Sequence, residues 1–194
     1  MSIATTRVVV QKGLSTKLEI IADKNILPYI KTQVKNECLT IGTLRNISLQ
    51  PSQSIEIHIT TPTLHTLRNS GSAQIVLPVT TAVEALQVYN SGSGSMELLL
   101  EAGLLEVCNS GSGELTLAGD VAKLSCNSSG SGHVKAENCF VKEVYFNASG
   151  SGQSYFSCGE KLVGFISGSG GVYYNGNPSF VQVDSPGSGK LSKN

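Results

Sequence analysis

A short glycine-serine turn recurs along most of this 194-residue chain. The first glycines of successive turns are Gly71, Gly92, Gly111, Gly130, Gly150, Gly168 and Gly187. Their spacings are 21, 19, 19, 20, 18 and 19 residues. A period of about 19 residues is too short for a helix-pair repeat or a propeller blade, and it is typical of one coil of a β-solenoid.

Aliphatic residues flank each turn at fixed distances. Positions four and six residues before the first glycine, and four and six after it, are mostly apolar, while the positions between them are mostly polar. This period of two predicts strands with one buried face. The position six residues before the glycine is occupied by His65, Leu86, Leu105, Leu124, Val144, Leu162 and Val181. Strand, turn and strand therefore form a rigid unit, and the loop side of each coil absorbs the variation in length.

The turns themselves are interpreted as structural corners. Glycine supplies backbone angles that other residues resist, and serines can stack from coil to coil. Asn69, Asn90 and Asn109 precede three successive turns, which predicts a short asparagine ladder. A phosphate-binding loop is disfavoured because no lysine follows and no helix begins. The structural turn glycines are Gly92, Gly94, Gly111, Gly113, Gly130, Gly132, Gly150, Gly152, Gly168 and Gly170.

The repeat divides a single domain of residues 1–194 into two regions. Residues 61–194 carry the coils, and residues 1–60 are less regular, with "RVVVQ", "KLEIIA", "CLTIG" and "SIEIHIT" as strands and "NILPYIKTQVKN" as a connecting segment. An open first coil would expose unpaired backbone groups, so this region is the expected cap. Little sequence follows the last turn, which predicts self-association through the carboxyl-terminal end.

Composition excludes several function classes. The chain has 14 basic and 14 acidic residues, so it lacks the basic field that nucleic acid requires. No apolar run reaches the roughly 18 residues of a membrane helix. The amino terminus shows no signal peptide, which leaves a cytoplasmic location or a signal already removed.

Several segments together resemble one known family. They are "LEIIADKNILPYIKTQVKNECLTIG", "IEIHITTPTLHTLRNSGSAQI", the chain of "SGSG" turns and "GGVYYNGNP". The chain is similar in these segments to the putative auto-transporter adhesin head GIN domain family. The resemblance implies a right-handed parallel β-helix in exported or cell-envelope bacterial proteins, and it supplies no catalytic residues. The chain departs from the family in showing no export signal and in its last turn, "SPGSG".

The best candidate binding face is aromatic. Tyr155 and Tyr173 share one outward offset on neighbouring coils, and Tyr145 points outward on the preceding strand. Exposed tyrosines bind sugar rings by apolar contact together with a hydroxyl. The alternative is an aromatic ladder that only steadies neighbouring strands, and this structural interpretation is favoured.

Catalysis would need acids or a base grouped on one outer face. Glu114 and His133 share one offset on adjacent coils, and Glu97 and Lys135 share another two coils apart. No second acid pairs with a first at a fixed position among these residues. A solvated surface with a few ion pairs is therefore favoured over an active site.

The five cysteines and three histidines do not predict a metal or a cofactor. No C-x-x-C pair occurs, the histidines are scattered, and the turns lack the aspartates of calcium-binding solenoids. Cys126 lies in an apolar column. The spacing of Cys139 and Cys158 allows them to be neighbours on adjacent coils, with a disulfide only in an oxidising compartment.

These observations predict an all-β, single-stranded, right-handed parallel β-helix of about seven coils with an amino-terminal β cap. The favoured function is a non-catalytic cell-envelope scaffold or adhesion module that binds a glycan or a surface protein. The alternatives are a carbohydrate-active β-helix enzyme and a scaffold that assembles end to end.

Overall fold

The computed structural model describes residues 6–44 and 51–194, and strands account for most of them. The amino-terminal elements are β1 (Thr6–Lys12), β2 (Lys17–Ile21), the 3-10 turn η1 (Leu27–Tyr29), β3 (Ile30–Lys35), β4 (Cys38–Thr43) and β5 (Ile55–Thr61). The repeated part contains β6 (Thr66–Asn69), β7 (Gln74–Asn90), β8 (Met96–Asn109), β9 (Leu115–Ser128), β10 (Val134–Ala148), β11 (Ser154–Ile166), β12 (Val172–Asn175), β13 (Phe180–Asp184) and β14 (Leu191–Lys193).

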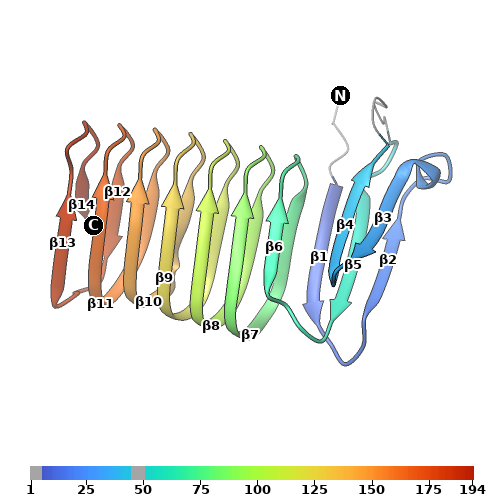
Figure 1. Cartoon of the computed structure of the whole chain (residues 1–194), viewed down its shortest axis with the longest axis horizontal. Coiled ribbons are helices and arrows are strands. Elements are labelled where there is room, and N and C mark those ends of the chain that lie inside the picture. The colour runs from blue at the N-terminus through green and yellow to red at the C-terminus, as the bar shows by residue number, and fades with distance from the viewer. Residues whose placement is uncertain (1–5, 45–50) are drawn as a thin grey trace.

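The repeated part winds into a flattened rod of stacked parallel strands, as the sequence predicts (Figure 1). The front sheet consists of β6, the second halves of β7 to β11, and β13. The back sheet consists of the first halves of β7 to β11, with β12 and β14. The SGSG turns connect the two sheets along the upper edge in Figure 1. Front strands rise and the chain advances from right to left, so the winding is right-handed.

The predicted inward columns form the core. In the front sheet Leu86, Leu105, Leu124, Val144 and Leu162 follow one another in register, and each is at most 1% exposed. In the back sheet Met96, Leu115 and Val134 stack in the same way. The two columns face each other inside the rod, so every coil removes several aliphatic side chains from water.

The turn glycines are required for a different reason from the predicted one. None of them has the positive φ that glycine tolerates, and among the described glycines only Gly119 and Gly176 do. Instead, a Cβ at Gly111 would overlap the carbonyl oxygen of Gly92 on the preceding coil, and the same overlap recurs at Gly92 against Gly71. From Gly92 onwards the turn backbones stack too closely to leave room for a Cβ at the first glycine, and this close approach selects glycine there.

The asparagine ladder is confirmed. Asn69, Asn90 and Asn109 pair in register and are buried beneath the turns. Each side-chain amide donates across its turn to a backbone carbonyl, as Asn69 Nδ2 does to Ala73 O at 2.7 Å. The column then continues as Ser128, Ala148 and Ile166, so first a hydroxyl and then apolar side chains take the place of the amide at the later turns. The ladder therefore closes the turns rather than linking the side chains to each other.

The far edge of each coil differs from the prediction of a loop. Strands β7 to β11 continue around this corner, and the variation in coil length is absorbed by shifts in pairing register. One shift lies between Leu77 and Thr81, and another lies between Lys135 and Asn138. Gly119, with φ of 113°, turns the corner of β9 directly above the Leu100 carbonyl.

The amino-terminal region covers the first coil by continuing the back sheet. β1 lies between β7 and β5 and pairs in parallel with both, and β2 closes the edge as an antiparallel strand. The predicted connecting segment contains η1 and β3, and β3 pairs with β4 in a separate two-stranded sheet. Ile26, Ile55 and Ile57 form a small second core beside the main one.

Candidate binding surfaces

The predicted pair of tyrosines is present on the outer face of the back sheet. Tyr155 and Tyr173 pair in register on β11 and β12, and their rings stack with centroids 5.0 Å apart and an interplanar angle of 14°. The Tyr155 hydroxyl donates to Gln153 Oε1 at 2.6 Å. On the following strand the register partner of Tyr173 is Ser192, a small residue. The pair therefore presents two aligned, half-buried rings next to the small side chain of Ser192.

Tyr145 does not join this pair. It lies in the second half of β10, on the front sheet, where its register partners are Ser125 and Val163. The ammonium nitrogens of Lys123 and Lys161 lie 4.6 Å and 5.4 Å from its ring centroid. The three predicted residues thus belong to two opposite surfaces, because a turn separates Tyr145 from Tyr155.

The charged residues considered for catalysis are engaged in local surface contacts. Lys135 Nζ lies 2.7 Å from Glu114 Oε2, and the hydrogen bond from this carboxylate raises the pKa of Lys135. Glu97 accepts a hydrogen bond from Gln74 Nε2 at 2.7 Å. His133 Nδ1 accepts the Gln153 backbone N–H at 3.1 Å. These contacts match the interpretation of a solvated surface with ion pairs.

A pair of acids at a fixed position does exist, at a place the sequence analysis did not consider. Glu101 and Asp120 pair in register at the far corner, each nine residues after the first glycine of its turn. They border a shallow groove of about 450 Å³ whose floor is made of small side chains such as Ala102 and Ala122. The common offset is the signal that would have found them.

An exposed aromatic residue closes one end of this groove. Phe140 is in register with Asp120 and is 48% exposed. Its ring lies over Gly159 of the next coil, where a Cβ would collide with it. One face of Phe140 is therefore supported by backbone, and the groove combines an apolar surface with two acids and Lys142.

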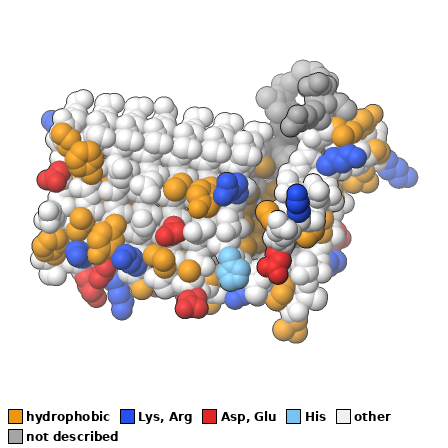
Figure 2. Space-filling model, viewed as in Figure 1, with side chains coloured by type: hydrophobic (Ala, Val, Ile, Leu, Met, Phe, Trp, Pro, Cys, Tyr) orange, Lys and Arg blue, Asp and Glu red, His pale blue; other side chains and the backbone are white. Residues whose placement is uncertain are grey.

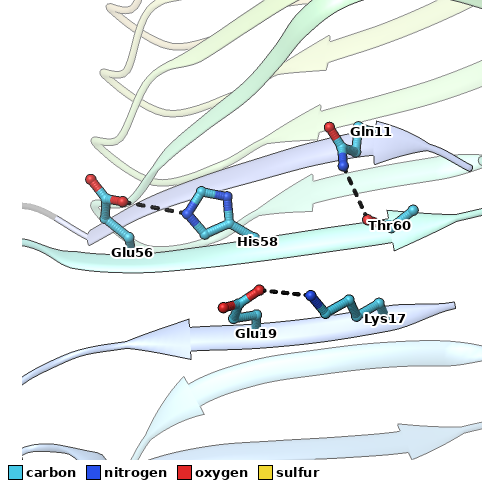
Figure 3. A network of polar contacts seen from close by, with 6 residues as sticks. All are labelled: Gln11, Lys17, Glu19, Glu56, His58 and Thr60. Carbon is cyan, nitrogen blue, oxygen red and sulfur yellow. Dashed lines mark hydrogen bonds and ion pairs between the residues drawn. The ribbon is translucent and has the colours of Figure 1, made fainter.

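The amino-terminal strands carry an ordinary polar surface. On β2, Lys17 Nζ lies 3.0 Å from Glu19 Oε2, and on β5, His58 Nε2 lies 3.4 Å from Glu56 Oε2 (Figure 3). The Lys17 ammonium lowers the pKa of Glu19. No group of three metal-ligating side chains occurs within residues 6–44 and 51–194.

The cysteines are free thiols in the structure. Cys158 pairs in register with Val141 and Cys139 with Gly119, so the two strands do not place the cysteines opposite each other. Burial raises the pKa of Cys126 and of Cys139 to about 12. These two cysteines act as small core residues.

The fold is a β-solenoid, because parallel coils stack on one another with their turn glycines in a row. Its two outer sheets form long lateral surfaces. The family model described as "Putative auto-transporter adhesin, head GIN domain" matches residues 4–178, and the chain belongs to this family. No curated protein matches the sequence. Within the described residues, no helix has the length and hydropathy needed to cross a membrane.

Solved structures share the fold over nearly the whole chain. A putative adhesin from Bacteroides fragilis NCTC 9343 is 22% identical, with a TM-score of 0.92 over 98% of this chain and 89% of that one. A putative lipid binding protein from Parabacteroides distasonis ATCC 8503 is 26% identical, with a TM-score of 0.77 over the same shares. A putative adhesin from Parabacteroides merdae ATCC 43184 is 21% identical, with a TM-score of 0.74 over 98% and 88%.

Proposed function

We propose that this protein is a non-catalytic adhesion module of the bacterial cell envelope that binds a glycan through Tyr155 and Tyr173. The family and two of its structural relatives are described as putative adhesins, which supports the general class. The observation that carries the site is the parallel stacking of two outward tyrosines on adjacent coils. Aligned rings with hydroxyls at their rims suit the apolar faces and hydroxyl groups of sugars.

The test is a glycan-array screen of the purified protein and of a Tyr155→Ala, Tyr173→Ala variant. We expect selective binding that the double variant loses while its circular dichroism stays unchanged. Tyr89→Ala is the matched control, because Tyr89 is a half-buried tyrosine on the front sheet, beneath Arg68. Binding that survives in the double variant, or that Tyr89→Ala also abolishes, would contradict the proposed site.

A carbohydrate-active enzyme is the second candidate function, and the groove at the far corner is the observation that favours it. Glu101 and Asp120 on neighbouring coils provide the two carboxyl groups that glycoside hydrolysis uses. Release of reducing ends from a polysaccharide by the natural protein, lost in Glu101→Gln and Asp120→Asn, would establish this activity. Intact polysaccharide after prolonged incubation would leave the non-catalytic function in place.

We also infer that the last coil contacts a further apolar surface, for which a second copy of the chain is the proposed partner. Val181 continues the inward column of Leu162, yet it is 44% exposed where Leu162 is 0% exposed. Phe180 beside it is 46% exposed. An apolar column that ends uncovered favours association, because burial of its last members removes apolar area from water.

A further inference from the structure

A row of alternating cations and aromatic rings runs along the front sheet, separate from the tyrosine pair. Lys123, Glu143, Lys161 and Phe180 occupy the same row on β9, β10, β11 and β13. Tyr145 starts two residues further along β10, and its hydroxyl donates to Glu143 Oε2 at 3.0 Å. The Tyr145 ring therefore leans back into the row and lies between the two lysines.

The distances within this row are those of cation–π contacts. Lys123 Nζ lies 4.6 Å and Lys161 Nζ 5.4 Å from the Tyr145 ring centroid. Lys161 Nζ also lies 5.4 Å from the ring centroid of Phe180, which is 46% exposed. Lysine, tyrosine, lysine and phenylalanine thus alternate over successive coils, and we call these four residues the lysine–aromatic strip.

The positive charges of the strip are not neutralised by ion pairs. Within the described residues, neither Lys123 nor Lys161 has a carboxylate within ion-pair distance, whereas Lys135 on the back sheet is paired at 2.7 Å. The carboxylate in the row, Glu143, accepts the tyrosine hydroxyl. Two ammonium groups therefore stand two coils apart, roughly 10 Å along the rod, on an exposed surface.

We propose that the lysine–aromatic strip binds an acidic polysaccharide, one whose sugars carry carboxylate or sulfate groups. The rings offer apolar faces to the C–H faces of sugar rings, and the ammonium groups offer charge to anions spaced along a polymer. Stacked strands place the four residues of the strip roughly 4.8 Å apart along the rod, so an extended polymer that lies along the rod can reach all of them.

The surrounding charges favour a narrow ligand over a flat anionic membrane. Two exposed acids lie beside the strip on the same sheet: Glu106 on β8, one coil before Lys123, and Asp184 on β13, the strand that carries Phe180. Figure 2 shows acidic, basic and hydrophobic side chains mixed on this face, gathered over the carboxyl-terminal coils. A flat anionic membrane would bring its headgroups close to these carboxylates, and like charges repel. A single polymer chain can contact the strip without approaching the acids.

The experiment measures binding of the immobilised protein to polygalacturonate, dextran sulfate and neutral dextran, and to vesicles of phosphatidylglycerol in phosphatidylcholine. We expect at least one acidic polymer to bind, dextran not to bind, and added salt to weaken the complex. Lys123→Gln with Lys161→Gln should reduce affinity by about tenfold, as removal of two charge-assisted contacts does. Tyr145→Leu should also weaken binding, because it removes the ring between the lysines.

Lys31→Gln with Lys35→Gln is the control, because it changes the net charge equally on exposed residues of β3. An equal loss of affinity in this control would show that overall charge causes the effect, and it would overturn the strip as the binding site. Unchanged binding in the Lys123, Lys161 variant would overturn it as well, as would binding to vesicles without binding to either acidic polymer. The Tyr155→Ala, Tyr173→Ala variant on the opposite sheet should bind the acidic polymers normally, so this inference and the proposed glycan site can fail separately. If the double lysine variant does not fold, Lys123→Arg and Lys123→Gln provide the same contrast with smaller changes.

Discussion

Close backbone approach between turns selects glycine at the first position of each turn from Gly92 onwards. The sequence suggested that glycine was needed for its backbone angles, yet the turn glycines have ordinary φ values. What excludes a side chain is the carbonyl oxygen of the preceding coil, which occupies the place of a Cβ. This steric overlap arises only after the coils have stacked, so its cause lies in the tertiary structure. The glycines that avoid the overlap are nevertheless visible in the sequence.

Gly111→Ala tests this interpretation. The new methyl group would overlap the Gly92 carbonyl, so we expect the free energy of unfolding to fall by about 1–3 kcal/mol, the usual range for an overpacked core. Urea denaturation followed by circular dichroism measures the change. Gly71→Ala is the control, because a Cβ at Gly71 would meet nothing within 4 Å. Equal losses in the two variants would show that backbone freedom, not close approach, selects glycine.

Burial of thiols predicts how stability changes at alkaline pH. The pKa of Cys126 and of Cys139 rises from an ordinary 9.0 to about 12 in the folded protein, chiefly because burial penalises the thiolate. Between these pH values the unfolded chain releases protons that the folded chain keeps, so the free energy of unfolding falls as pH rises.

The measurement is the thermal midpoint at about pH 8 and about pH 10.5, on either side of the thiol transition of the unfolded chain. Cys126→Ala with Cys139→Ala should lose less stability between the two pH values than the natural protein. The exposed Cys38 provides the control, and Cys38→Ala should leave the alkaline loss unchanged. An alkaline loss of the same size in all three proteins would contradict the role of the buried thiols.

Strands differ in how far neighbouring elements protect them. β8 and β9 pair on both sides with other coils, and their inward residues are almost fully buried. β3 and β4 pair only with each other, and most of their residues are exposed. Two strands alone are marginally stable, so this hairpin is expected to open independently of the rod.

Hydrogen exchange tests this difference between elements. We expect the backbone amides of Ile30–Lys35 and Cys38–Thr43 to exchange far faster than those of β8 and β9, because a local opening suffices to release them. Peptide-level mass spectrometry resolves the two groups. Protection of the hairpin as strong as that of β8 would mean that it unfolds only together with the rod.

At the scale of the whole molecule, the rod has one end closed by β2 and another where the inward column is exposed at Val181. Stacking of coils gives the molecule two long lateral surfaces with different chemistry. The back sheet carries the tyrosine pair, and the front sheet carries the lysine–aromatic strip. Because the two surfaces are separate, the ligands proposed for them would not compete for one site.

Sedimentation velocity over a wide range of concentrations tests association of the exposed end. We expect the average mass of the natural protein to rise with concentration, and Val181→Glu to abolish the rise because a charge would enter the contact. Val79→Glu is the matched control, since Val79 is 55% exposed at the far corner and lies outside the last coil. A single monomeric mass at every concentration would contradict the association.

The sequence by itself determined the coil. Residues at the same distance from their turn occupy the same place on successive coils. Columns such as Leu86, Leu105 and Leu124 could therefore be aligned from spacing alone, and the structure pairs them in that register. The family resemblance fits the same architecture. The stacked Tyr155 and Tyr173 were found in this way too, since they share one offset from their turns.

Only the tertiary structure decided which surfaces these residues reach. Tyr145 lies on the other sheet from Tyr155 because a turn intervenes, and its lysine neighbours come from coils 22 residues before and 16 after in the chain. Glu101 and Asp120 share one offset from their turns, but a register shift between Lys135 and Asn138 places Phe140 opposite Asp120 although its offset differs. The complete groove therefore emerged only from the folded chain. Local spacing specifies a repeated unit, whereas contacts between units depend on how closely and in which register those units stack.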